Sequence, residues 1–228
     1  MIKMQLRTII KSWVCYGVMI SAVSVGRVCF ASGGNFEYWD VTEVSFDINK
    51  DWRGVFEERI KVRDTGGELF YHHSDLGFVY KSFADWIDVG VNFRKIYTKD
   101  SEGEWRQEDR PHLNATLKTK IFGCEMSDLS RVEYRNIEKA EDFWRYRNKL
   151  TVKLPVELTS WKLQPYFAEE VFISMNGEGF NRNRVFGGFI VKLSKNVKGD
   201  IFYIWQADSA EGSWEDINII GTGLKFHF

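Results

Sequence analysis

The sequence of 228 residues has few prolines and no excess of charge of either sign. It contains 3 Pro, whereas 44% of its residues are hydrophobic and 16% are aromatic, which is too many bulky side chains for a disordered chain. Its 31 basic residues are balanced by 32 acidic ones, and no segment concentrates positive charge. We therefore expect one globular domain and no nucleic-acid partner.

Cysteine is also scarce, and the number of cysteines in the mature protein depends on whether the N-terminus is cleaved. Lys3, Arg7 and Lys11 precede an apolar stretch that closes on small residues at Ala31. This layout predicts a secretory signal peptide, residues 1–31, cleaved after Ala31. A membrane anchor is the rival interpretation, but Arg27 and two glycines interrupt the apolar run.

Cleavage would leave a domain of residues 32–228 with Cys124 as its one cysteine, so no disulfide could form within it. Gly123 and Glu125 offer no basic group that could activate the thiol. We interpret Cys124 as a residue of a tight turn. Lipidation of Cys29 is disfavoured because Val28 stands where a small residue is required.

Motifs that hold cofactors are missing as well. The sequence has no phosphate-binding loop and no dinucleotide fingerprint. His112 and His227 lie far apart and form no metal-ligand pattern. We expect no cofactor and no metal.

After residue 35 the sequence lacks helical periodicity, and almost every stretch alternates apolar and polar residues with a period of two. Such alternation predicts half-buried β-strands. Clusters of turn-forming residues separate the stretches, for example 64–67, 176–179 and 210–213. Eleven strands are predicted, over 36–48, 52–63, 69–80, 86–97, 113–122, 126–136, 143–154, 161–174, 181–194, 200–207 and 216–228.

Two all-β architectures fit this alternation. A soluble sandwich or ligand-binding barrel buries the apolar face, whereas a membrane barrel turns that face to lipid and lines its lumen with the polar one. A period of two does not show which face of the strands points into the barrel.

Three features favour the membrane barrel. The predicted strands are long enough to cross a bilayer when tilted. Aromatic residues cluster toward strand ends, where an interfacial girdle would place them: Tyr38, Trp39, Trp52, Trp86, Tyr97, Phe143, Trp144, Trp161 and Trp214. The chain also ends on Gly223, Phe226 and Phe228, an ending that resembles the signal by which outer-membrane proteins are recognised by their assembly machinery.

The sequence therefore predicts a transmembrane antiparallel up-and-down β-barrel of about 10–12 strands, with short periplasmic turns. Longer and shorter connections between the predicted strands roughly alternate, the longest being 98–111. Bacterial barrels with both termini in the periplasm have an even number of strands. The count of eleven thus implies one strand miscounted, and we expect that error before residue 64.

In such a barrel the face opposite the lipid carries many charges. Unpaired charges in a narrow lumen would be costly, so they should form ladders of arginine and carboxylate across neighbouring strands. The ladders could simply fill and brace the lumen, or the excess of cations could line a narrow path or bind an anion. The predicted ladder consists of Arg59, Arg131, Glu133, Arg135, Arg145, Arg147, Glu170 and Arg184.

The order of these motifs resembles a family of uncharacterised bacterial outer-membrane β-barrel proteins grouped as a domain of unknown function. The resemblance covers most of the chain after the predicted signal, and Trp205 departs from it where a tyrosine is expected. It implies an outer-membrane barrel and no established activity. It is carried by Arg-Val-Glu-Tyr-Arg at 131–135, Arg-Tyr-Arg at 145–147, Glu-Val-Phe at 170–172, Asn-Arg at 183–184 followed by Gly187 or Gly188, and the terminal Phe228.

We therefore expect a non-enzymatic, monomeric envelope protein, structural or weakly channel-forming, whose partners are outer-membrane lipids and, during biogenesis, the barrel assembly machinery. One alternative is a lipid hydrolase that uses His72 as general base and Ser74 as nucleophile, both expected to face lipid beside Phe70 and Leu76. Asp75 falls on the opposite face, so the imidazole lacks an evident acid partner. The other alternative is a soluble periplasmic barrel that binds a small apolar ligand.

Overall fold

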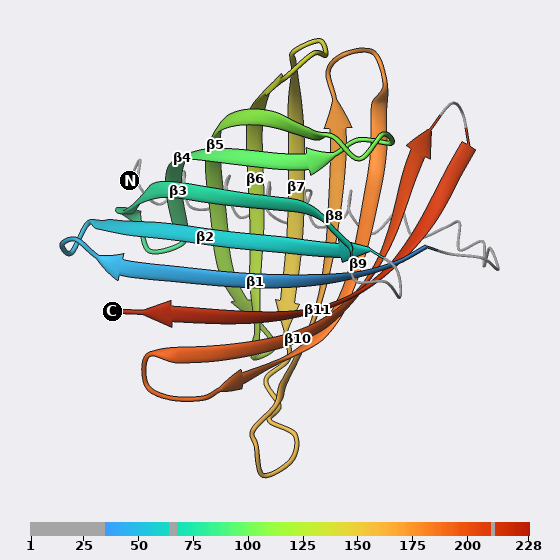
Figure 1. Ribbon diagram of the computed structural model, residues 1–228. Coiled ribbons are helices and arrows are strands. Elements are labelled where there is room, and N and C mark those ends of the chain that lie inside the picture. Colours follow the sequence, from blue (N-terminus) through green and yellow to red (C-terminus); the bar gives the residue numbers. More distant parts are fainter. Residues whose placement is uncertain (1–34, 64–67, 211–212) are drawn as a thin grey trace. The chain divides into compact units, whose positions relative to one another are not determined.

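The computed structural model describes residues 35–63, 68–210 and 213–228, which form strands that close into one barrel (Figure 1). The predicted signal peptide, 1–31, lies outside these residues. No helix in the described ranges is long and apolar enough to cross a membrane. The strands are β1 (Asn35–Asp47), β2 (Trp52–Arg63), β3 (Glu68–Ala84), β4 (Ile87–Lys99), β5 (Trp105–Ile121), β6 (Cys124–Ile137), β7 (Phe143–Lys153), β8 (Gln164–Ser174), β9 (Gly179–Lys192), β10 (Val197–Ala210) and β11 (Ser213–His227).

Each predicted strand coincides with one of these, so the predicted all-β barrel is confirmed. The largest difference is at β5, which begins at Trp105 inside the predicted connection 98–111. Polar residues occupy both faces at its start, Gln107 and Asp109 on one face and Glu108 and Arg110 on the other. No apolar alternation marks that part of the strand.

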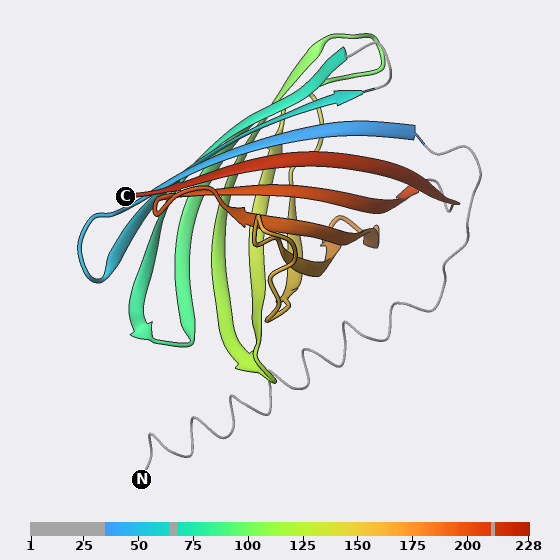
Figure 2. The same ribbon diagram turned by 90° about the horizontal axis from the view of Figure 1, so that it is seen from below.

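The expectation of an even strand number is wrong for the described residues, which hold eleven strands. All neighbours are antiparallel except β1 and β11, which pair in parallel, from Asn35 opposite Ile217 to Ser45 opposite His227. They run side by side along the barrel wall in Figures 1 and 2. A closed barrel with an odd number of strands requires one parallel pair. Because β1 and β11 run in the same direction, both begin at one end of the barrel and finish at the other.

The connections do not alternate in length as expected. The end that carries Phe228, here called the C-terminal end, has two-residue turns at 85–86 and 122–123 but also the longest connection, 154–163. Cys124 follows the turn of Phe122 and Gly123, whose φ angles are 51° and 83°. This placement agrees with the interpretation of Cys124 as part of a tight turn.

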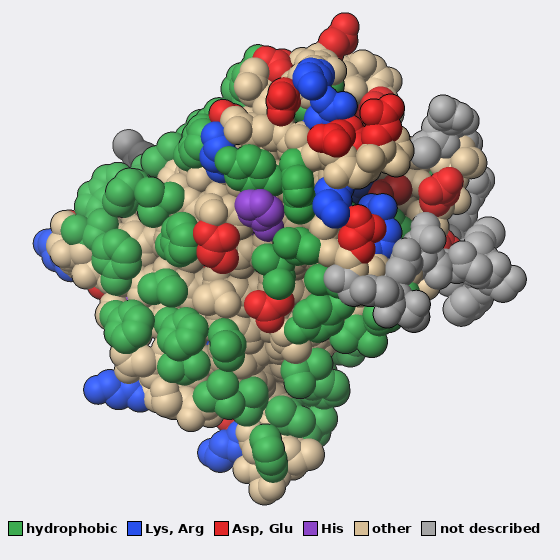
Figure 3. All heavy atoms as spheres, viewed as in Figure 1, with side chains coloured by type: hydrophobic (Ala, Val, Ile, Leu, Met, Phe, Trp, Pro, Cys, Tyr) green, Lys and Arg blue, Asp and Glu red, His purple; other side chains and the backbone are tan. Residues whose placement is uncertain are grey.

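The apolar face of the strands points outward and the charged face points inward. Leu76, Val91 and Leu113 are 53%, 51% and 62% exposed, whereas Glu133 is fully buried. In the space-filling view of Figure 3, hydrophobic side chains cover much of the viewed face. The alternation of period two thus separates an apolar outer face from a charged inner face, as predicted for a barrel with lipid on the outside.

Part of the lumen is nevertheless apolar. Gly188 makes room for this packing, because a Cβ there would lie 2.7 Å from the carbonyl oxygen of Ile201. The cluster is built by β1 and β8 to β11 and comprises Trp39, Val41, Tyr166, Ala168, Phe186, Phe202, Ile204 and Ile219.

Aromatic pairs lie on the outer surface near both ends of the barrel. Trp52 contacts Tyr80 at the C-terminal end, and Tyr134 contacts Trp144 at the opposite end, each with ring centroids 5.1 Å apart. Two predicted girdle residues were placed wrongly. Trp39 is 1% exposed in the apolar cluster, and Phe143 lies under Arg135 on the lumen face because β7 begins there with its first residue pointing inward.

Candidate functional site: the charged lumen

The structure places all eight residues of the predicted ladder on the lumen face. Cross-strand register sets Glu133 opposite Arg145 and Glu170 opposite Arg184. Because side chains alternate along each strand, these residues all point into the lumen. The antiparallel register between neighbouring strands determines which charges meet.

Glu133 is the centre of one group of ion pairs. Its carboxylate is 0% exposed and accepts a hydrogen bond from Arg145 Nε. Arg147 Nη1 lies 3.4 Å away and Arg110 Nη1 3.7 Å away. A buried carboxylate with three guanidinium neighbours holds the strands β5, β6 and β7 together from inside.

A second group forms around Glu170 on β8. Arg147 Nη2 donates to one of its oxygens at 2.5 Å, and Arg184 Nη1 donates to the other at 3.3 Å. The ring of Phe172 lies between guanidinium groups, with Arg147 and Arg184 each 4.7 Å from its centroid. Stacking on this ring provides an apolar surface for arginines that are removed from water.

Arg135 and Arg131 differ in how they are paired. Arg135 donates to both oxygens of Glu108, at 2.8 and 2.9 Å. Arg131 Nε donates to Asn114 Oδ1 at 2.7 Å, and no ion pair to Arg131 occurs within the described ranges. Arg59 Nη2 pairs with Glu57 Oε1 at 3.2 Å, while its Nε is buried without a hydrogen-bond partner in the described structure.

A third group was missed by the sequence reasoning. Arg94 Nε donates to Asp75 Oδ2 at 2.7 Å, and His112 Nε2 lies 3.0 Å from the same oxygen. His73, 0% exposed, places its Nε2 2.9 Å from Glu57 Oε1. These contacts join strands β2 to β5. Their residues are separated in sequence, so the strand register was needed to find them.

The described part of the chain holds no group of three or more histidine, cysteine or acidic side chains arranged to bind a metal ion. The charged side chains around Glu133, Glu170 and Asp75 instead form ion pairs with one another. His73, Glu133, Glu170 and Arg94 are between 0% and 5% exposed, although they surround the barrel axis. Side chains therefore pack closely around these four residues.

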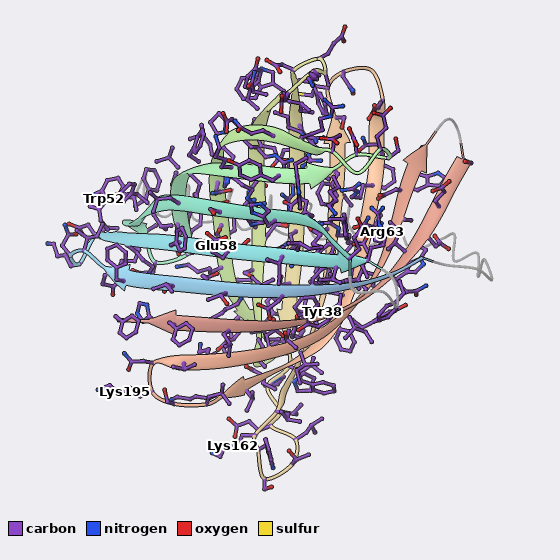
Figure 4. All side chains as sticks on the ribbon, viewed as in Figure 1. Tyr38, Trp52, Glu58, Arg63, Lys162 and Lys195 are labelled. Carbon is purple, nitrogen blue, oxygen red and sulfur yellow. The ribbon has the colours of Figure 1, made fainter. Side chains whose placement is uncertain are left out.

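His72 and Ser74 face outward, as the hydrolase alternative requires. The ring of His72 stacks on Tyr97 with centroids 4.7 Å apart, and the register places Glu58, also outward, opposite Ser74. The three side chains make no hydrogen bond with one another in the described structure. Glu58 is labelled on the outer wall in Figure 4.

Phe70 was expected on the same outward face, and this expectation is wrong. Its side chain is 6% exposed and lies under the guanidinium of Arg63. A register shift between Lys61 and Val62 inserts one residue into the β2–β3 pairing. Such a bulge reverses the alternation beyond it.

The residues of the predicted assembly signal lie on both faces of β11. Phe228 is 67% exposed, and Phe226 pairs with Val44 on the outward face. Gly223 faces the lumen between Val41 and Asp200. The terminal aromatics are thus presented outward at the C-terminal end.

Outside the strands, the acidic turn residues are held by hydrogen bonds at the end opposite the C-terminus. Asp142 accepts hydrogen bonds from Asn136 Nδ2 at 2.7 Å and from the Tyr134 hydroxyl at 2.9 Å. These bonds hold the pKa of Asp142 below its ordinary value.

The fold and the lumen define a closed transmembrane β-barrel, apolar outside and filled with charged and apolar side chains inside. The chain belongs to the family described as "Protein of unknown function (DUF2490)", which it matches over residues 36–216. The resemblance drawn from the motif order is thereby confirmed.

Comparison with curated proteins gives no match. Among solved structures, LpxR from Salmonella typhimurium is similar with a TM-score of 0.48 and 7% identity, over 77% of this chain and 83% of that one. The beta domain of the Bordetella autotransporter BrkA is similar with a TM-score of 0.41 and 12% identity, over 75% and 81%. Likenesses this distant say nothing of activity.

Proposed function

We propose that this protein is a non-enzymatic barrel of the bacterial outer membrane with a structural role and a closed lumen. In this proposal the signal peptide 1–31 is cleaved on export, and the assembly machinery recognises Gly223, Phe226 and Phe228. The mature barrel is a monomer whose partners are membrane lipids. The soluble alternative is not retained, because it requires the apolar face inside.

The near-zero exposure of the charged residues around Glu133 and Glu170 supports this proposal most strongly. In a water-filled pore, side chains such as Glu133 and Arg145 would be open to solvent, yet they are 0% and 6% exposed. Their charges are compensated by one another rather than by water and mobile ions. A barrel sealed in this way should not conduct at rest.

Planar-bilayer recording tests the closed lumen. Purified wild-type protein should insert without steady current, and Arg145→Ala with Arg147→Ala should produce current because two large side chains and their pairs with Glu133 and Glu170 are lost. Arg106→Ala, which removes a partner of Asp100 at the barrel rim, is the matched control and should stay silent. Steady wild-type current whose anion preference changes with Arg131→Glu would instead support the weak channel.

Cell fractionation tests the location. The protein should sediment with outer membranes and require detergent for release. Release by osmotic shock without detergent would contradict the proposal.

A lipid hydrolase remains the second candidate because His72, Ser74 and Glu58 share the outward face. Overexpression of the wild type should then alter the acyl chains of membrane lipids, and Ser74→Ala should abolish the change. Unchanged acyl chains on wild-type overexpression would remove this candidate.

A further inference from the structure

Five lysines face the lumen near the C-terminal end of the barrel and form a group here called the lysine mouth. Lys192, Lys198 and Lys225 are exposed, so this group can be reached from outside. Its members are Lys149 and Lys153 on β7, Lys192 on β9, Lys198 on β10 and Lys225 on β11.

The strand register sets three of these cations directly against one another. Lys198 lies opposite Lys192 on one neighbouring strand and opposite Lys225 on the other. Like charges in directly opposed positions on paired strands destabilise a sheet.

The two remaining lysines lie on β7, which is separated from β9 by one strand, β8. Lys198 and Lys225 both act electrostatically on Lys153. Lys149, Lys153 and Lys225 all act on Asp200. The cations of β7 and β11 therefore act on one carboxylate, while Lys198 of β10 lies opposite Lys225 in the register.

Counter-charges are too few for this group. Asp200 accepts a hydrogen bond from Tyr166 at 3.3 Å, and Glu43 lies opposite Lys225 in the register. Glu125 lies 3.8 Å from Lys153 but also opposite Lys120. Within the described ranges, no ion pair forms to four members of the mouth, Lys149, Lys192, Lys198 and Lys225.

The deeper lumen is built differently. Glu170, which is opposite Lys149 in the register, is already held by Arg147 and Arg184. The Lys149 ammonium instead lies 3.7 Å from the ring centroid of Phe186. The mouth thus carries positive charge that the protein itself does not neutralise.

We propose that the lysine mouth binds a phosphate-bearing anion that enters from the C-terminal end. Lysine ammonium groups are compact point charges that bind phosphate, and a concave site lined by one sign of charge concentrates counter-ions. The phosphate can come from a free solute or from the headgroup of an anionic lipid. Binding at the mouth requires no conduction through the deeper lumen.

Calorimetric titration of the full barrel in non-ionic detergent with pyrophosphate tests the site. The wild type should bind saturably, and Lys198→Gln with Lys225→Gln should weaken binding at least about tenfold, since each lost ion pair with a phosphate reduces the attraction. Lys162→Gln with Lys195→Gln removes the same charge from exposed loops at the same end (Figure 4) and should leave binding unchanged.

Thermal unfolding separates binding from a purely structural role. Pyrophosphate should raise the wild-type Tm. The Lys198→Gln, Lys225→Gln variant should have a higher Tm than the wild type without ligand, because repulsion is removed, and should not respond to pyrophosphate. A lower Tm for this variant, or equal loss of binding in the loop control, would overturn the proposal.

Nanodiscs distinguish the two sources of phosphate. If a headgroup occupies the mouth, phosphatidylglycerol should raise the wild-type Tm relative to phosphatidylcholine and reduce pyrophosphate binding. If a solute occupies it, pyrophosphate should bind equally in both. Absence of any effect of pyrophosphate and phosphatidylglycerol on the wild type would refute the site.

Discussion

The lumen is filled by two regions of contrasting chemistry, a charged network on β2 to β9 and an apolar cluster on β1 and β8 to β11. The charged region is stable only if each charge finds a partner, because removing ions from water is costly. The apolar region gains from burial alone and needs shape rather than pairing. The same lumen is therefore closed by ion pairs in one region and by apolar packing in the other. Mutations in the two regions should lower stability for different reasons.

The largest effect is expected from breaking the charged network at its centre. Glu133→Ala leaves Arg145 and Arg147 without their shared buried carboxylate, and should lower the free energy of unfolding by about 3–5 kcal/mol. Unfolding in urea, followed by tryptophan fluorescence in lipid vesicles, measures this loss. Glu157→Ala removes an exposed pair with Lys162 and should cost less than about 1 kcal/mol. Equal effects of the two variants would show that burial does not matter.

A cavity in the apolar cluster should cost somewhat less. Ile219 is 0% exposed, and Ile219→Ala should lower the unfolding free energy by about 3 kcal/mol. Ile220→Ala is the neighbouring control, since that side chain is 44% exposed on the lipid side and its loss leaves no cavity. The comparison fails if the Ile220 variant is the less stable of the two in the same urea titration.

Added bulk should test how tightly the apolar cluster is packed. Gly188→Ala places a Cβ against the carbonyl of Ile201 and the ring of Tyr166, and should cost about 2 kcal/mol. At Gly187 the nearest atoms to such a Cβ are 3.9 Å away, on Phe167, so Gly187→Ala should be nearly neutral. The difference between the two midpoints of thermal unfolding measures the packing, and a difference near zero would indicate a loosely packed lumen.

The smallest effect is expected outside both regions, at Asp142. Its pKa is depressed by hydrogen bonds from Asn136 and Tyr134, so the stability it contributes is present above its ordinary pKa of 3.8 and disappears as the pH falls through the lower, folded value. Asp142→Asn should remove this part of the acid dependence and leave stability near neutral pH little changed. Urea unfolding between pH 2 and 7 tests it, and an unaltered acid profile would contradict the assignment.

The sequence predicted the charged region better than the apolar one, for a physical reason. Along β7, Arg145 and Arg147 alternate with Trp144 and Tyr146, so period two separates the two faces. Along β10 both faces are apolar, with Ile201 and Tyr203 outside and Phe202 and Ile204 inside. No alternation marks the lumen side there, and the apolar cluster was missed.

Other features depend on relations between distant strands. The parallel seam of β1 and β11 and the meeting of Asp75 with His112 follow from closure and register. The inward turn of Phe70 follows from a single bulge. A period of two gives the side of each residue on its own strand but carries no information on pairing across strands.

Spin-label accessibility tests whether the apolar faces of the strands contact lipid. In a Cys124→Ser background, nitroxides at Val91→Cys and Val132→Cys should collide often with oxygen dissolved in lipid and rarely with a water-soluble nickel complex. A nitroxide at Arg131→Cys should be poorly accessible to either. High nickel and low oxygen accessibility at Val91 and Val132 would mean that these side chains do not face lipid, and the account would be wrong.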